Sequence, residues 1–474
     1  MTLRGITVSK ASSSVVRQLL RTLILPVAMC LSGGAVAQSA PDTALVERGR
    51  YLATAADCIA CHTVDQSKPF AGGVPIPTPF GKIIAPNITP DPETGIGNWT
   101  DEEFYRAMHE GVGRNGENLY PAFPYDSFTK LSRDDVLAIK AYLFTLPAIS
   151  QVNPESDLEF PFNQRWILSG WKLVNLRKGE LQPDPSQDAA WNRGAYLVEA
   201  LAHCGTCHTP RDFSMGSDES RKFGGGAVGS WQAYNITPDP VSGIGDWSDD
   251  ELVEYMRTGK VAGKGGAAGE MGEAVEHSLS KLPEQDLRDI VTYLRAQKPI
   301  RDPADEKPRH GWGEPHEDVS AFRGDEGGDE VDGRAIFYGA CSSCHGMAGA
   351  GTDDEEFPSL FGNTVVGYRQ PNNLVMAILE GVHRTVDGDT ASMEAFEHKL
   401  TSAEVAAVSN YVLETYGNPG AATVDAGMVD KLRENTGEQP LVAKLALPGM
   451  VIGVIVLVLV VLWLLTRRRR RSRR

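Results

Sequence analysis

The pentapeptide "CIACH", residues 58–62, directs the interpretation of this chain because it returns as "CGTCH" at 204–208 and "CSSCH" at 341–345. Two thiols at this spacing can add to the vinyl groups of haem as thioethers, and the next residue, a histidine, then lies beneath the iron as its proximal ligand. The pattern therefore predicts three covalently bound c-type haems. Their expected attachment residues are Cys58, Cys61, Cys204, Cys207, Cys341 and Cys344, and their expected proximal ligands are His62, His208 and His345.

Other uses of paired cysteines fit the pattern less well. Six cysteines in an exported chain ordinarily suggest disulfides. A thioredoxin-type redox motif does not need the following histidine, and a zinc site would combine two cysteine pairs. Three successive C-x-x-C-H motifs in one chain favour haem over each of these alternatives.

The chain also repeats itself around these motifs. "NITPDPETGIGNWTDEE" begins at Asn87 and recurs 148 residues later as "NITPDPVSGIGDWSDDE" at Asn235. Each of the three copies opens with a short helical pattern that runs into the haem motif and closes with a longer amphipathic one, such as "PEQDLRDIVTYLRAQKP". Two helices around a haem, with loops elsewhere, are typical of a small cytochrome domain. The sequence thus predicts a mainly α fold: three tandem cytochrome c domains plus a C-terminal transmembrane helix.

The expected boundaries follow from these patterns and from the segments between them. They are a signal peptide at 1–37, cytochrome c domain 1 at 40–150, a packed connector at 151–187, domain 2 at 188–300, a linker at 301–328, domain 3 at 329–418, a linker at 419–444, a transmembrane helix at 445–466 and a cytoplasmic basic tail at 467–474. The apolar, aromatic connector is expected to pack against the first two domains. The charged, Gly- and Pro-rich linker at 301–328 is expected to be exposed.

The second axial ligands are predicted from a common register. A glycine ends the helix before the ligand loop in each repeat, and the residue twelve positions later is the candidate ligand. The three pairs are Gly111 and Phe123, Gly259 and Met271, and Gly381 and Met393. Thioether sulfur is a soft ligand suited to haem iron and raises its potential. Met271 and Met393 are therefore the expected distal ligands of the second and third haems.

Phe123 has no atom that coordinates a metal, so the first haem needs another ligand or has none. Met108 and His109 are the further Met and His candidates in this part of the chain. Met108 is aligned with Met256 and Ile378, which indicates a buried helix position. His109 remains a substitute ligand, behind an open or water-bound iron.

Both ends of the chain carry membrane signals. Residues 1–37 combine scattered basic residues, an apolar run and "AVA" before Gln38, which is the expected mature start. A lipoprotein site at Cys30 is the alternative, but Met29 stands where a small residue is expected. Residues 445–466 are uncharged and long enough to span a bilayer, and seven arginines follow. Because arginines stay cytoplasmic, a single-pass inner-membrane protein with periplasmic haem domains is expected.

The charge of the exported part excludes nucleic acid as an expected partner. The formal net charge is −16, and removing the eleven basic residues of the two ends lowers it to −27. Such a surface favours basic partners or neutral small molecules.

With these residues in hand, the chain resembles the membrane-bound triple-haem cytochrome c subunit of bacterial periplasmic dehydrogenases acting on alcohols, gluconate or polyols. The resemblance runs through "RGRYLATAADCIACHT", "FAGGVPIPTPFGKIIAPNITPD", "LYPAFPYDSFTKLS", "FNQRWILSGWKL" and "SSCHGMAGAGT". It implies a subunit that takes electrons from a catalytic partner and passes them to ubiquinone. Phe123 departs from the alcohol dehydrogenase pattern, which has Met there, and is more similar to cytochromes that accompany molybdenum hydroxylases of aldehydes or N-heterocycles.

The expected function is therefore electron transfer from a periplasmic dehydrogenase to ubiquinone or the respiratory chain, without catalytic residues of its own. Two alternatives stay open at this point. One is a haem enzyme that binds peroxide or thiosulfate at an open first haem. The other is an electron-entry subunit of a terminal oxidase.

Overall fold

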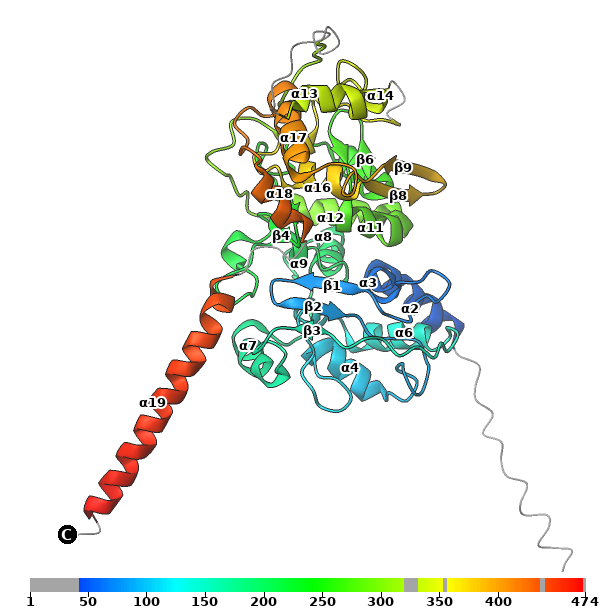
Figure 1. The fold of residues 1–474 in the computed structure, drawn as a ribbon. Helices are drawn as coiled ribbons and strands as arrows, with labels where there is room; N and C mark the ends of the chain where they lie inside the picture. The colour runs from blue at the N-terminus through cyan, green and yellow to red at the C-terminus, as the bar shows by residue number, and fades with distance from the viewer. Residues whose placement is uncertain (1–41, 319–330, 353–355, 435–439, 472–474) are drawn as a thin grey trace, which may run out of the picture. The chain divides into compact units, whose positions relative to one another are not determined.

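The structure is a computed structural model that describes residues 42–318, 331–352, 356–434 and 440–471 (Figure 1). The expected signal peptide, Cys30 and Gln38 lie outside the described residues, as do parts of both predicted linkers and the end of the basic tail.

The first repeat, residues 43–150, is helical with a small sheet. Its helices are α2 (Thr43–Ala55), α3 (Cys58–His62), α4 (Asp101–Glu110), α5 (Tyr125–Phe128) and α6 (Arg133–Leu143). Strands β1 (Pro75–Thr78) and β2 (Gly81–Ile84) form an antiparallel sheet with the later β3 (Asp157–Leu158). Helix α2 crosses α6 at Gly49, where an added Cβ would lie 1.8 Å from the Ala138 carbonyl oxygen. The close approach of these two helices requires glycine at this position.

The second repeat, residues 188–300, is built in the same way. Its helices are α8 (Ala189–Tyr196), the π-helix η2 (Leu197–Leu201), α9 (Gly205–His208), η3 (Glu219–Arg221), α10 (Asp249–Thr258), α11 (Gly269–His277), η4 (Leu279–Lys281) and α12 (Glu284–Arg295). Its hairpins are β4 (Gly226–Val228) with β5 (Trp231–Ala233), and β6 (Lys260–Val261) with β7 (Gly265–Gly266). Gly194 lies against the Asp289 carbonyl as Gly49 lies against that of Ala138.

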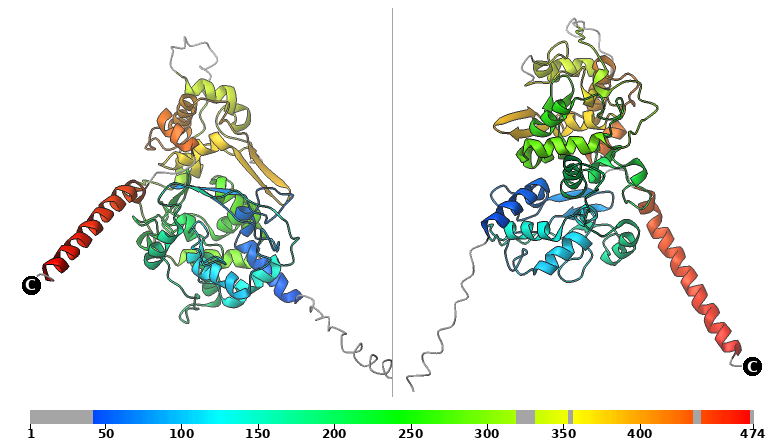
Figure 2. Two further views of the ribbon diagram at one scale, coloured as in Figure 1. Left: turned by 60° about the horizontal axis from the view of Figure 1, so that its bottom comes forward. Right: turned by 180° about the vertical axis from the view of Figure 1, so that it is seen from behind.

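The third repeat, residues 331–433, keeps the opening and closing helices. Its elements are α13 (Gly333–Ile336), the π-helix η7 (Phe337–Cys341), α14 (Ser342–His345), α15 (Thr364–Gly367), α16 (Asn372–Glu380), α17 (Ser402–Tyr416), α18 (Ala426–Arg433), and the hairpin of β8 (Val382–Val386) with β9 (Asp389–Met393). Helices α16, α17 and α18 pack together in both views of Figure 2.

The same local signal begins one helix in each repeat. Helices α4, α10 and α17 begin at capping boxes, in which a Ser or Thr hydroxyl accepts from the backbone three residues on and a Glu carboxylate accepts in return. Helices α4 and α10 end at left-handed glycines, Gly111 and Gly259. These residues explain why the repeat pattern of the sequence becomes a repeat of structure.

The first and second repeats share one hydrophobic core, in which Leu52, Val136, Leu197 and Leu287 belong to a single buried cluster. Two reciprocal hydrogen bonds connect their helices. Tyr51 donates to the Asp286 carboxylate at 2.5 Å, and Tyr196 donates to the Asp135 carboxylate at 2.5 Å. Because each repeat gives a tyrosine and receives one, the contact is self-complementary.

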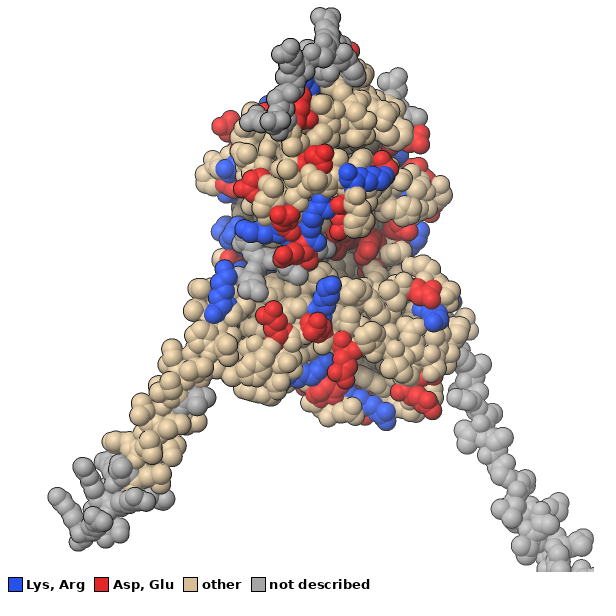
Figure 3. All heavy atoms as spheres, viewed as in Figure 1, with Lys and Arg blue, Asp and Glu red and all other residues tan. Residues whose placement is uncertain are grey.

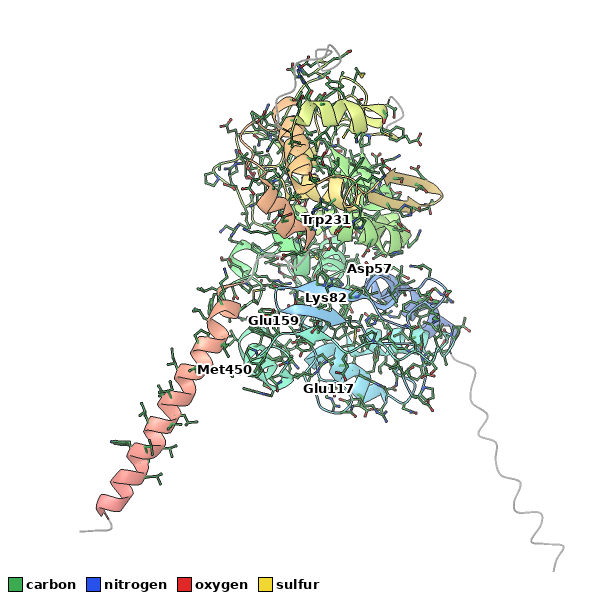
Figure 4. All side chains as sticks on the ribbon, in the orientation of Figure 1. Asp57, Lys82, Glu117, Glu159, Trp231 and Met450 are labelled. Carbon is green, nitrogen blue, oxygen red and sulfur yellow. The ribbon has the colours of Figure 1, made fainter. Side chains whose placement is uncertain are left out.

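The third repeat has a separate core that reaches the second repeat through Trp231. The Trp231 indole nitrogen donates to Glu380 at 3.1 Å, beside the third repeat's helices (Figure 4). The Gln232 amide donates to the Asn373 side chain, whose amide returns a bond to the Gln232 carbonyl. Strand β8 adds further contacts with the second repeat. The Thr385 amide donates to Glu276, and Arg384 donates to the Ala267 carbonyl. Val386 belongs to the core of the first two repeats. The third repeat therefore keeps most of its own core but is attached by more than the contacts around Trp231.

The first connector, residues 151–187, contains η1 (Arg165–Ile167) and α7 (Leu168–Asn175) as well as β3. It contacts both of the first two repeats. Lys172 donates to the Gly111 carbonyl at 2.6 Å, and the Ser214 hydroxyl donates to the Asn175 side chain at 3.0 Å.

The second connector, residues 301–318, packs closely against other segments at two of its residues. Arg309, in η5 (Arg309–Gly311), is only 8% exposed. Gly313 lies so close to the Tyr416 carbonyl that an added Cβ would be 1.9 Å from its oxygen. Most of the described connector is nevertheless exposed, as its composition predicts, and Arg309 is the buried exception.

Helix α19 (Leu441–Arg471) contains the predicted transmembrane segment. Residues Leu441–Leu465 form a helix long and apolar enough to cross a membrane, with a mean hydropathy of 3.0. Figure 3 shows uncharged side chains along most of this helix, whereas acidic and basic side chains are interspersed over the face of the haem-motif repeats.

Candidate functional site

The three C-x-x-C-H motifs place their histidines in the same way. Helices α3, α9 and α14 end at His62, His208 and His345. The Nδ1 atoms of these rings lie 2.7, 2.7 and 3.0 Å from the carbonyl oxygens of Pro86, Tyr234 and Pro358. A donor bond from Nδ1 fixes the ring and leaves Nε2 available for a metal. All three histidines therefore have the arrangement of an oriented axial ligand.

The cysteines of the motifs form no disulfides, and the thiols of the first two motifs are not activated as nucleophiles. The six cysteines within the described residues are free of disulfides. Burial raises the pKa of Cys58, Cys61 and Cys204 to about 12, so their thiolates are scarce at neutral pH. A thiolate nucleophile or redox-active dithiol needs the opposite shift. Reaction of both thiols with a covalent group fits these sites better.

A cavity of about 260 Å³ lies in the second repeat, bounded by Cys204, Cys207 and His208 and by Met271. Its walls are mostly apolar, including Ile236, Ile244, Leu252, Met256, Leu279, Ile290 and Leu294. Two buried hydroxyls on its wall, those of Tyr234 and Thr364, have no hydrogen-bond partner in the described part of the chain. Attachment thiols, an oriented histidine, a thioether, apolar walls and unpartnered polar atoms fit a haem with polar propionates.

The structure supports the comparison of Phe123 with Met271 up to the start of each ligand loop. The Leu119 amide donates to the Gly111 carbonyl at 2.7 Å, and the Ala267 amide donates to the Gly259 carbonyl at 2.7 Å. In both repeats, the donor is the amide eight residues after the glycine that ends the helix. Phe123 packs instead among aromatic rings, with its centroid 5.4 Å from that of Phe128. An aromatic side chain thus occupies the register position of a sulfur ligand.

The two substitute ligands considered for the first motif are both buried in α4. Met108 is 5% exposed and belongs to the shared core. His109 stacks on Tyr105 with ring centroids 4.1 Å apart, and burial lowers the pKa of its imidazole. In the second repeat, Met256 lines the cavity while Arg257, the counterpart of His109, is not among the lining residues. By this register, His109 lies on the side of α4 that faces away from the expected haem.

The third motif and its candidate ligand belong to one core. Cys341 and Met393 both pack against the third repeat's buried cluster. Met393 ends strand β9 and is paired with Val382, the first residue of β8. The third ligand loop is therefore a β-hairpin, unlike the helical segment α11 that carries Met271.

Some residues of the cavity were not predicted from the sequence. Asp57, Glu270 and Arg309 line it together with the motif. Burial raises the pKa of Asp57 well above its usual value and that of Glu270 to about 7. The position of Asp57 next to Cys58 was a usable signal. Nothing in the spacing of the second connector singled out Arg309.

The first two motifs lie close to one another. Helix α3, which is the first motif, contacts α11, which carries Met271. Helix α5 makes the corresponding contact with η2, just before the second motif. The shared core therefore brings the first C-x-x-C-H motif next to the segment that carries Met271.

Comparison with known proteins gives these sites a family. Residues 46–147 match the model described as cytochrome c, and residues 328–412 match the model described as cytochrome c oxidase, cbb3-type, subunit III. The fructose dehydrogenase cytochrome subunit of Gluconobacter japonicus is 41% identical over 449 residues, which cover 90% of this chain and 92% of that protein. The chain belongs to the family of cytochrome c subunits of dehydrogenases.

Two further relatives of this cytochrome c subunit differ in how much they share with it. The gluconate 2-dehydrogenase cytochrome c subunit of Pantoea cypripedii is 34% identical over 88% of this chain and 96% of its own. A nicotinate dehydrogenase subunit of Pseudomonas putida is 40% identical over 78% of this chain but only 30% of its own length. The family confirms the expected covalent c-type haem and the expected role in electron transfer from a dehydrogenase.

Proposed function

We propose that this cytochrome c subunit carries three haems in series and conducts electrons from a periplasmic dehydrogenase to ubiquinone in the inner membrane. The observation that carries the proposal is the contact between the first motif helix, α3, and α11 of the second repeat within one core. Bound haem supplies one-electron redox chemistry, and its iron alternates between two oxidation states. The contribution of the chain is to attach, orient and bury these groups.

The proposed attachment residues are the six cysteines of the three motifs, with His62, His208 and His345 as proximal ligands. Met271 and Met393 are the proposed distal ligands. The bond from each histidine Nδ1 to a backbone carbonyl, repeated in all three motifs, and the position of Met271 on the cavity wall support this assignment. The first haem is proposed to lack methionine ligation, because Phe123 occupies that register.

The proposed topology has one membrane span near the C-terminus and the three cytochrome c domains in the periplasm. The apolar helix Leu441–Leu465 and the seven arginines that follow support this orientation. Residues 1–37 are proposed to be a signal peptide that is removed before Gln38.

The partner is proposed to be a dehydrogenase subunit that holds the substrate site. The relatives are named for fructose, gluconate and nicotinate dehydrogenases, so the substrate varies among partners of related cytochromes.

Purification from membranes with the associated polypeptides tests the function. The complex is expected to reduce ubiquinone when the partner's substrate is added, while the separated chain oxidises no substrate. Haem stain and intact mass should give three haems per chain. Efficient turnover of peroxide or thiosulfate by the separated chain would contradict the proposal and favour the haem enzyme.

A further inference from the structure

Arg309 is a buried cation without a carboxylate partner among the residues that the structure describes. Its Nη1 donates to the Ser242 carbonyl at 2.6 Å, and its Nη2 donates weakly to the Asn235 and Gly243 carbonyls at 3.4 Å. None of the described ion pairs includes it. A buried guanidinium needs a compensating charge, because its transfer from water is costly.

Aromatic rings of two repeats hold this guanidinium in place. Its central carbon lies 4.8 Å from the ring centroid of Tyr234 and 5.6 Å from that of Tyr368. The Tyr234 carbonyl is also the acceptor for His208. Arg309 is thus fixed between the proximal side of the second motif and the third repeat, with little freedom to seek solvent.

Arg309 lines the cavity of the second repeat, and it differs there from the other basic residue, Lys264. Lys264 is neutralised by Glu251, with 2.8 Å between the ammonium nitrogen and a carboxylate oxygen. Arg309 therefore has a positive charge that no described carboxylate on this wall neutralises by an ion pair. A haem brings two propionates, and a guanidinium is well suited to bind carboxylates.

The first repeat has an apolar residue at the same spacing in the sequence. Asn87 donates to the Ile149 carbonyl at 2.7 Å, as Asn235 donates to the Ile300 carbonyl at 2.7 Å. Nine residues after these isoleucines stand Leu158 and Arg309, each 8% exposed. Leu158 lies in β3 opposite Gly81, whereas Arg309 lies in η5 beside Tyr234, so the spacing carries a cation in the second connector and none in the first.

We propose that Arg309 binds a propionate of the haem attached at Cys204 and Cys207 and raises the reduction potential of that haem. The inference rests on the proposed haem attachment. Reduction adds one negative charge to the haem, and a nearby desolvated cation stabilises the reduced form more than the oxidised form. Arg309 acts as a positioning and charge-balancing residue, and no electron passes through it.

Replacement of Arg309 in the full-length chain tests this assignment. Potentiometric titration of the haem absorption bands should show that Arg309→Gln lowers the midpoint potential of one haem by about 59 mV. At a fixed potential, the ratio of oxidised to reduced form of that haem would then be about tenfold higher. Arg309→Lys should keep the midpoint potential of that haem close to its value in the unmodified chain, because lysine keeps the positive charge. Lys307→Gln removes the same charge from an exposed position two residues away and should leave all midpoints unchanged.

The alternatives give different results. Unchanged midpoints in Arg309→Gln with all haems attached would overturn the inference, and so would an equal shift in Lys307→Gln. If Arg309→Gln does not fold, a folded Arg309→Lys with a shift as large as tenfold would overturn it, whereas near-native midpoints would support it. A haem count of two in the unmodified chain, with no haem on the second motif, would instead reject the proposed attachment.

Discussion

The first and second repeats have nearly the same scaffold but different surroundings for their motifs. Both contain a capped helix, a left-handed glycine and a histidine bound to a backbone carbonyl. They differ at the twelfth residue after that glycine, which is Phe123 in the first repeat and Met271 in the second, and the connector after the second repeat has Arg309 where the spacing gives Leu158 after the first. Loss of a sulfur ligand and loss of a cation both destabilise reduced haem. We therefore expect the first haem to have the lower potential, so that electrons move downhill from the first repeat to the second.

Removal of the attachment cysteines should have the largest effect on haem content and stability. Cys204→Ala with Cys207→Ala should lower the haem count from three to two, and the empty cavity in the core shared by both repeats should destabilise the first repeat as well. Cys341→Ala with Cys344→Ala should also remove one haem but leave the first two repeats stable, because the third core is separate. Intact mass and thermal unfolding measure both effects. Cys30→Ala is the control and should keep three haems.

Exchange of the distal residues tests the difference between the repeats directly. Phe123→Met should raise the midpoint potential of one haem by about 59 mV or more, which is a tenfold change in its ratio of reduced to oxidised form. It should also abolish carbon monoxide binding at that haem. Met271→Phe should lower a different midpoint and create a second site for carbon monoxide. Spectra with three methionine-ligated haems before any substitution would show that the register from Gly111 to Phe123 does not predict ligation.

Glu199 makes the stability of the paired repeats depend on pH. Burial alone would raise its pKa, but Lys130 of the first repeat and Lys222 lower it to about 2. The depressed pKa in the folded state contributes about 3 kcal/mol to the free energy of unfolding. This contribution is fully present above about pH 4.5 and is lost as the pH falls towards 2.

Glu199→Gln should therefore reduce the free energy of unfolding at pH 7 and flatten its fall between pH 4.5 and 2. Chemical denaturation at several pH values measures this. Glu102→Gln removes an exposed partner of Arg133 and should change the stability by less than about 1 kcal/mol. Equal effects of the two variants would mean that the contact between Lys130 and Glu199 does not stabilise the pair.

The reciprocal tyrosines should give the smallest effects and the most nearly equal ones. Tyr51→Phe and Tyr196→Phe each remove a hydrogen bond to a partly buried carboxylate, Asp286 or Asp135, and should cost about 1–2 kcal/mol. Similar losses from both variants in thermal unfolding would support a self-complementary contact. A loss from only one of them would show that the two halves of the contact are not equivalent.

Much of the local structure was predictable because its signals are local. The motifs lie on short helical turns, and Ser248 and Thr401 begin helices as their positions before acidic residues indicate. The spacing from Gly259 singled out Met271, which lines the cavity, and its ligation of a haem stays a prediction. The partial burial of the second connector was missed, because its composition is that of an exposed linker and its burial depends on rings from two other segments.

The sequence by itself determined which chemistry to expect at each site, since two thiols and a histidine within five residues predict a covalent haem without help from the fold. It also determined the candidate membrane helix, which depends only on a continuous apolar run. Only the tertiary structure decided which sites are neighbours and which charges surround them. The shared core of the first two repeats and the position of Arg309 beside Tyr234 and Tyr368 arise from contacts between residues far apart in the chain, and each such contact depends on the packing of all the others.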